Sequence, residues 1–170
     1  MENIEIKARV EKLDRMREKV NTLEHTYVGF DHQIDTYFKM ANGRLKLRES
    51  SLSGPELIFY LRENIIGPKN SVYHKLPVED PQGLINLLTK MQGIHKIIEK
   101  NREIYLYQNV RIHLDDVKNL GNFLEFEAVM NKKYNDKNVE AKKVNYLMDK
   151  LGIKDKDLIS GSYENLVETF

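Results

Sequence analysis

Hydrophobic and polar residues alternate along several short segments of this chain, which is the pattern of β-strands with one apolar face. In the first such segment, residues 3–9, Ile4 and Ile6 lie on one face. The opposite face carries Asn3, Glu5, Lys7 and Arg9. An acid followed by a base at this spacing is a first indication of metal and phosphate chemistry, although a solvent-facing strand shows the same pattern.

The alternation recurs often enough to predict a mainly β protein. Asn42-Gly43 and Leu120-Gly121 mark turns between neighbouring strands, and residues 67–70 are expected to form a loop. The predicted strands cover residues 3–9, 32–40, 44–48, 56–62, 71–76, 94–102, 110–115 and 122–130. Eight strands of this kind favour an antiparallel meander that closes into a barrel.

Four segments have the spacing of amphipathic helices instead. The first covers residues 10–23, and the last two cover residues 138–150 and 162–167. A further helix is predicted from Pro81 to Met91, because Asp80 is a suitable N-cap and proline is favoured at the first helical position. The expected fold class is therefore α+β, with one domain over residues 1–170 and helices packed outside the barrel.

The composition of the chain excludes several classes of function. Lys and Arg number 27 against 26 for Asp and Glu, so no overall charge attracts nucleic acid or an anionic membrane. The absence of cysteine excludes disulfides, thiol catalysis and Cys-ligated zinc. No apolar stretch reads as a signal peptide or a membrane span, so we expect a cytoplasmic protein without a nucleic-acid or membrane partner.

Two arrangements of the strands are open on pattern alone. In the first, the apolar faces point inward and form an ordinary core that includes Ile4, Ile6, Leu47 and Phe126. In the second, helices cover the apolar faces and the barrel encloses seven cations and four acids. Buried unpaired charges are too unfavourable to be kept for stability, so this interior requires a charged ligand, such as a polyphosphate with a divalent ion.

Several motifs, in this order, resemble the CYTH superfamily, also called triphosphate tunnel metalloenzymes. The superfamily includes class IV adenylyl cyclases, thiamine triphosphatases and inorganic tripolyphosphatases, and the resemblance covers essentially the whole chain. Asn3-Ile4-Glu5-Ile6-Lys7 is similar to the E-x-E-x-K signature, with Asn3 in place of the first Glu. The other matching segments are residues 35–38, 43–48, 99–102, 113–115, 120–127 and Ser162-Tyr163, and the overall similarity is greatest to the class IV cyclases.

The resemblance implies an eight-stranded antiparallel tunnel that binds a nucleoside, organic or inorganic triphosphate with Mg²⁺ or Mn²⁺, in a protein that is often a homodimer. The implied triphosphate contacts are Lys7, Lys46, Arg48, Arg62, Lys100, Arg102 and Arg111. The implied metal ligands are Glu5, Asp115, Glu125 and Glu127. An amide oxygen at Asn3 can coordinate Mg²⁺ but brings no negative charge.

Other polar residues keep two interpretations. His113 shares a face with Arg111 and Asp115, where it could contact phosphate or serve as a structural histidine. Tyr37 and Tyr60 could orient a ligand or simply pack, and Lys69 could be an ordinary solvated loop lysine.

The resemblance, together with these residues, implies three alternative functions. The first choice is a cyclase that converts ATP to cyclic AMP and pyrophosphate, through attack of the ribose 3′-hydroxyl on the α-phosphate. The second is a triphosphatase, in which water attacks the terminal phosphate. The third is a non-catalytic module that binds polyphosphate or nucleotide, because Asn3 replaces a carboxylate of the signature. No residue is assigned as the general base.

Overall fold

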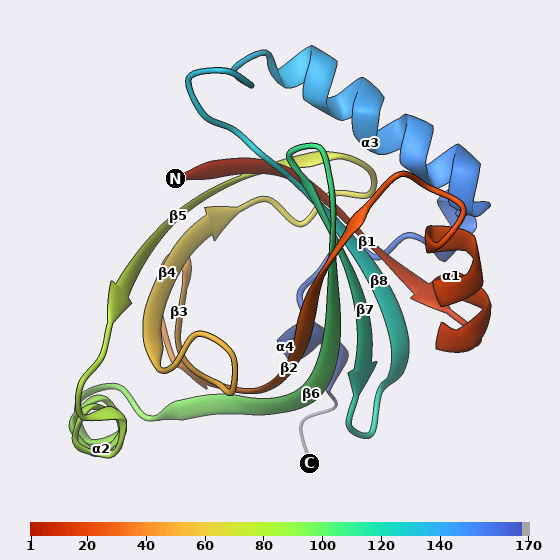
Figure 1. Cartoon of the computed structure of the whole chain (residues 1–170). Coiled ribbons are helices and arrows are strands. Elements are labelled where there is room, and N and C mark those ends of the chain that lie inside the picture. Colours follow the sequence, from red (N-terminus) through yellow and green to blue (C-terminus); the bar gives the residue numbers. More distant parts are fainter. Residues whose placement is uncertain (168–170) are drawn as a thin grey trace.

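The computed structural model describes residues 1–167 and contains a closed barrel of eight antiparallel strands (Figure 1). This confirms the predicted fold class. The strands are β1 (Glu2–Val10), β2 (Thr26–Phe38), β3 (Arg44–Ser50), β4 (Glu56–Arg62), β5 (Lys69–Pro77), β6 (Ile94–Tyr107), β7 (Val110–Val117) and β8 (Gly121–Val129). The helices are α1 (Leu13–Val20), α2 (Pro81–Met91), α3 (Lys137–Leu151) and α4 (Tyr163–Leu166), with a 3₁₀ turn η1 (Asp155–Asp157).

The strand order around the barrel is β1-β5-β4-β3-β2-β6-β7-β8, so the barrel is not the simple meander we predicted. Consecutive strands pair except where a helix intervenes: α1 separates β1 from β2, and α2 separates β5 from β6. At these places β1 pairs with β5 and β8, while β2 pairs with β6.

The apolar strand faces point outward, and helices cover two parts of them, which decides between the two predicted arrangements. Ile4, Ile6 and Phe126 pack beneath α1 and α3 on one side of the barrel. On another side, Leu47 packs with Leu88 of α2. Figure 1 shows α1 and α3 together on one flank and α2 apart from them. The polar strand faces therefore enclose the space inside the barrel.

Several element boundaries differ from the prediction. The first helix begins at Leu13 rather than Val10, because β1 continues to Val10 in register with Asn122. β2 begins at Thr26 and β6 extends to Tyr107, since residues 26–30 pair with residues 103–106 beyond the predicted strands. β5 begins at Lys69, within the predicted loop. The last three residues of the predicted 1–170 domain lie outside the described residues.

In residues 1–167, no helix has both the length and the apolar character that crossing a membrane requires.

Candidate functional site

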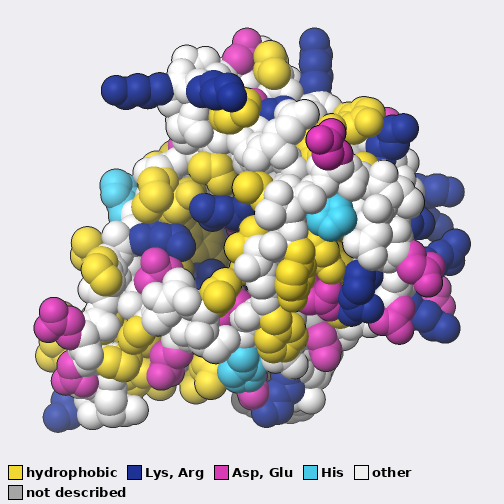
Figure 2. Space-filling view, in the orientation of Figure 1, with side chains coloured by type: hydrophobic (Ala, Val, Ile, Leu, Met, Phe, Trp, Pro, Cys, Tyr) yellow, Lys and Arg dark blue, Asp and Glu magenta, His cyan; other side chains and the backbone are white. Residues whose placement is uncertain are grey.

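The interior of the barrel, called the tunnel below, is a cavity of about 360 Å³, which lies within the usual range for ligand pockets. Figure 2 shows a hollow at one end of the barrel with Lys and Arg side chains at its edge. The described charged residues that line the tunnel are Lys7, Lys46, Arg48, Arg62, Lys75, Lys100, Arg102, Arg111, Glu5, Asp31, Glu56, Glu125 and Glu127. Ten of the eleven charged residues predicted for the site are among them. The eleventh, Asp115, lies in the tunnel wall, where it accepts hydrogen bonds from Arg102.

Asp35 of β2 is the centre of the largest cation cluster, which we call the Asp35 cluster: Asp35, Lys46, Arg48 and Lys100. The Asp35 carboxylate is fully buried and accepts hydrogen bonds from Lys46 Nζ at 2.8 Å and Lys100 Nζ at 3.0 Å. Arg48 donates to both carboxylate oxygens, from Nε at 2.7 Å and Nη2 at 2.8 Å. One carboxylate therefore holds three predicted phosphate contacts from two neighbouring strands in one place.

Burial and charge shift the titration of this cluster in opposite directions. Burial alone would raise the pKa of Asp35, but the positive charges of Arg48, Lys100 and Lys46 hold that pKa well below its ordinary value. Burial lowers the pKa of Lys100 to about 8, because the attraction of Asp35 offsets only part of the desolvation. An anionic ligand that supplied further negative charge would favour the protonated form of Lys100.

Both carboxylate oxygens of Asp115 on β7 accept hydrogen bonds from other side chains. Arg102 donates to both of its oxygens at 2.6 Å, and the Tyr163 hydroxyl donates to Oδ2 at 2.5 Å. Burial works in the opposite direction, but Arg102 keeps the pKa of Asp115 far below its ordinary value. In this geometry Asp115 orients Arg102 and Tyr163, and its predicted role as a metal ligand stays a prediction.

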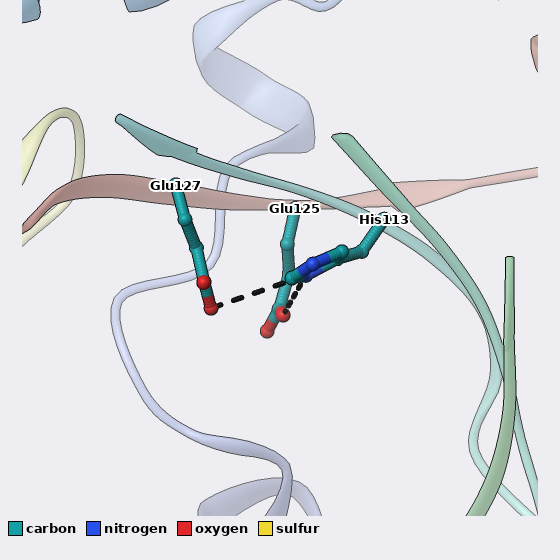
Figure 3. A group of neighbouring side chains, drawn as sticks. All are labelled: His113, Glu125 and Glu127. Carbon is teal, nitrogen blue, oxygen red and sulfur yellow. Dashed lines mark ion pairs between the residues drawn. The ribbon is translucent and has the colours of Figure 1, made fainter. Parts of the chain in front are cut away.

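His113, Glu125 and Glu127 form the described group best placed to bind a metal ion, with one ligand atom from each residue all within 4.8 Å of one another. Figure 3 shows these side chains pointing toward one another from β7 and β8. His113 Nδ1 lies 3.5 Å from Glu125 Oε2 and 3.9 Å from Glu127 Oε1. Lys7 and Arg102 also contact the Glu125 carboxylate.

The chemistry of this group fits a hard divalent ion. His113 is 4% exposed, and its Nδ1 is a buried polar atom without a hydrogen-bond partner. Burial and the nearby Arg102 lower the pKa of His113 to about 3, so the ring is neutral at physiological pH, as a metal ligand must be. Two carboxylates and an imidazole suit Mn²⁺, and the carboxylates alone suit Mg²⁺. The family resemblance implies Glu125 and Glu127 as metal ligands, whereas the sequence pattern assigns His113 no such role.

Glu5 lies beside this group and contacts a cation. It is opposite Glu127 in the β1–β8 pairing, and Arg62 donates to its carboxylate. Arg111, which is more exposed than the other predicted contacts, lies 3.8 Å from Glu127. Both residues face the tunnel.

The segment that leads into α4 closes one end of the tunnel, called the floor below. Ser162 Oγ accepts a hydrogen bond from Arg62 at 2.5 Å and lies 3.1 Å from the Tyr60 hydroxyl. The Tyr163 ring lies 3.5 Å from Lys7 Nζ, a cation–π contact. The Ser162-Tyr163 motif thus contacts predicted phosphate ligands from outside the barrel strands.

Lys69 corrects one interpretation of the sequence. It is 2% exposed, and its Nζ donates to the carbonyls of Ile65, Ile159 and Ser160 at 2.7–3.1 Å. Lys69 is therefore a buried residue that connects β5 to the floor segment by hydrogen bonds, rather than a solvated loop lysine. Its position after Gly67-Pro68 resembles a loop in sequence, and only the pairing of Lys69 with Glu5 reveals the strand.

Comparison with known proteins agrees with this geometry. The sequence model of the CYTH domain matches residues 1–163. The chain belongs to the CYTH domain family. A relative from Methanocaldococcus jannaschii, named as a putative adenylate cyclase, is 25% identical over 98% of both chains.

Solved structures show the same CYTH fold. The PH1012 protein of Pyrococcus horikoshii OT3 superposes with a TM-score of 0.86 at 24% identity, over 98% of this chain and 99% of that one. A Vibrio parahaemolyticus protein described as a putative adenylate cyclase gives a TM-score of 0.80 at 20% identity, over 96% of each chain. At these identities the likeness establishes the fold alone.

Proposed function

We propose that this CYTH protein is a divalent-metal-dependent enzyme that acts on a triphosphate inside the tunnel. The observation that carries the proposal is the Asp35 cluster, in which three buried cations face a cavity of ligand size. Such a concentration of buried positive charge facing a cavity is suited to a polyanion. The family membership supports the same substrate class.

The residues that line the tunnel have two roles, phosphate binding and metal binding. Lys46, Arg48 and Lys100 bind and orient phosphate oxygens and neutralise the charge that develops on them during transfer. His113, Glu125 and Glu127 hold the metal, which supplies Lewis-acid stabilisation of the phosphates when it is bound. Asp35 and Asp115 keep the cations in place, because their carboxylates accept hydrogen bonds from Arg48 and Arg102.

Conversion of ATP to cyclic AMP and pyrophosphate is the reaction we place first. The Methanocaldococcus relative, named as a putative adenylate cyclase and similar along nearly its whole length, supports this choice. Hydrolysis of the terminal phosphate is the second candidate. It sets fewer geometric conditions, because water rather than an aligned ribose hydroxyl attacks, and the group of His113, Glu125 and Glu127 could hold an ion for it.

Product analysis by phosphorus NMR tests the proposal. Purified protein is incubated with ATP, or with tripolyphosphate, in Mg²⁺ or Mn²⁺. Pyrophosphate with cyclic AMP identifies the cyclase, whereas orthophosphate with ADP, or with pyrophosphate from tripolyphosphate, identifies the triphosphatase. Metal-dependent binding without any product identifies the non-catalytic module and refutes the enzyme.

Two variants test whether the tunnel is responsible. We expect Lys100→Ala and Glu125→Ala to lower the rate at least a hundredfold, because they remove a phosphate contact and a metal ligand. Lys118→Ala and Glu24→Ala are matched controls on the exposed surface and should leave the rate unchanged. Unchanged turnover in both tunnel variants would place catalysis elsewhere.

A further inference from the structure

Gln33 of β2 presents a hydrogen-bond acceptor that nothing in the described chain uses. The side chain is 4% exposed and lines the tunnel, and its Oε1 has no partner. Its Nε2 donates to Asp31 Oδ2 at 2.6 Å. Because an ionised carboxylate can only accept, this bond fixes the amide with its oxygen directed away from Asp31. A buried carbonyl oxygen without a donor is unfavourable, so this atom is suited to an N–H group of a ligand.

Asp31 also fixes Leu52, one of three apolar residues that lie near this acceptor. Its carboxylate accepts hydrogen bonds from Ser50 Oγ at 2.8 Å and from the Leu52 backbone N–H at 3.1 Å, which ties down the loop between β3 and β4. Leu52 lines the tunnel together with Val28 and Ile104. Leu52 and Val28 are 51% and 50% exposed, so the rim faces solvent where the tunnel opens. We call these three residues the rim.

The strand register places the acceptor and the rim in sequence along the tunnel. Gln33 pairs with Lys100 and lies two residues from Asp35, a distance of about 7 Å along a strand. Farther along β2, Gly29 pairs with Ile104 of the rim. Tyr37, on the other side of Asp35, lies near Tyr60 and the floor. A ligand with its phosphates at the Asp35 cluster would direct its remaining group toward Gln33 and the rim, away from the floor.

We infer that Gln33 and the rim bind the organic group of the substrate, and that this group is a heterocycle with an exocyclic amino group. The amino N–H donates to Gln33 Oε1, and the ring contacts the apolar side chains of Val28, Leu52 and Ile104. A bare polyphosphate uses neither feature. The inference rests on the proposed triphosphate site and narrows its substrate to amino-bearing nucleoside triphosphates or similar esters.

The test compares ligands that differ at one group. Binding of tripolyphosphate, ATP and inosine triphosphate is measured by calorimetry in metal-free buffer, so that no metal-dependent turnover occurs. Inosine triphosphate has a carbonyl in place of the adenine amino group. Its carbonyl oxygen would face Gln33 Oε1, and neither atom can donate a hydrogen bond. We expect ATP to bind at least fivefold more tightly than inosine triphosphate. CTP and UTP form the corresponding pyrimidine pair and show whether the site takes the larger or the smaller ring.

Two variants assign the preference to these residues. Gln33→Met removes the acceptor and should bring ATP and inosine triphosphate within twofold of each other, with tripolyphosphate affinity unchanged. Leu52→Ala should weaken ATP about fivefold and leave tripolyphosphate unchanged, because it removes apolar contact area. Leu87→Ala, on α2 and 54% exposed, is the matched control and should change neither affinity.

The outcomes separate this inference from the proposed function. If tripolyphosphate binds but wild-type protein distinguishes neither ATP from inosine triphosphate nor CTP from UTP, the inference is wrong. The proposed triphosphate site then stands. A loss of tripolyphosphate affinity in Gln33→Met equal to that of ATP also overturns it. If wild-type protein binds no triphosphate in this buffer or with Mg²⁺ or Mn²⁺ added, the proposed function fails and the inference fails with it.

Discussion

Asp35 offers the sharpest test of how the tunnel keeps its cations together. Asp35→Asn preserves the shape of the side chain but removes the one negative charge that contacts Lys46, Arg48 and Lys100 at 2.7–3.0 Å. Removing one partner from a buried ionic network leaves the remaining charges uncompensated, which lowers stability by about 3 kcal/mol or more. We therefore expect the free energy of unfolding of Asp35→Asn to fall by about 3 kcal/mol at pH 7.

The assay is urea denaturation followed by far-UV circular dichroism, with the denaturant slope compared between variants. Asp116→Asn makes the same chemical change on an exposed residue of β7 and should stay within about 0.5 kcal/mol of wild type. If Asp35→Asn unfolds at the same urea concentration as Asp116→Asn, the cations do not depend on the Asp35 charge and the argument for the cluster is refuted.

Acid provides an independent check of the same interaction. The pKa of Asp35 lies well below its ordinary value of 3.8 in the folded protein, because three cations outweigh the effect of burial. A group with a lowered folded pKa contributes its full stabilisation above the unfolded pKa and loses it as the pH falls toward the folded pKa. The stability difference between wild type and Asp35→Asn should therefore change little between about pH 5 and pH 7, below the pKa of Lys100, and shrink below about pH 4.

Four other residues give shorter tests. His113→Ala should weaken Mn²⁺ binding at least tenfold by electron paramagnetic resonance, whereas His74→Ala, on the exposed face of β5, should not. Asn3→Glu restores the acid of the family signature in place of an amide whose buried Oδ1 has no hydrogen-bond partner, and should strengthen Mn²⁺ binding; weaker binding would contradict this. Tripolyphosphate affinity should fall as pH rises through about 8, where Lys100 loses its proton, and Lys100→Arg should move that loss to higher pH. Tyr163→Leu should raise KM more than Tyr163→Phe, which keeps the ring beneath Lys7; equal effects would assign the contact to the hydroxyl.

The sequence predicted the barrel because its alternation is strict where it matters for the site. Glu5 and Lys7 alternate with Ile4 and Ile6, and the family signature resolved which face points inward. The pattern fails at residues 26–30, where a register shift between Tyr27 and Gly29 breaks the period of two. For this reason the beginning of β2, and with it the rim residue Val28, was missed.

The relations between charges could not be predicted from the sequence, because they depend on which strands become neighbours. Asp35 is one acid between Ile34 and Thr36, and its role appears only when the register sets it opposite Arg48. Lys100 joins the same carboxylate from β6, 65 residues farther along the chain. Likewise, the contact between Asp115 and Arg102 follows only from the β6–β7 pairing, which sets the two residues opposite each other.

The acids of the tunnel explain how the protein can fold before a ligand arrives. Eight described Lys or Arg residues line the cavity against five acids, and Asp35 and Asp115 stand behind them in the wall. The wall acids offset most of the buried positive charge, so the empty barrel avoids the repulsion of a purely cationic interior. What remains is a modest excess of cations facing the cavity. A triphosphate with a bound divalent ion carries only part of its full negative charge and matches that modest excess better than a naked polyanion would.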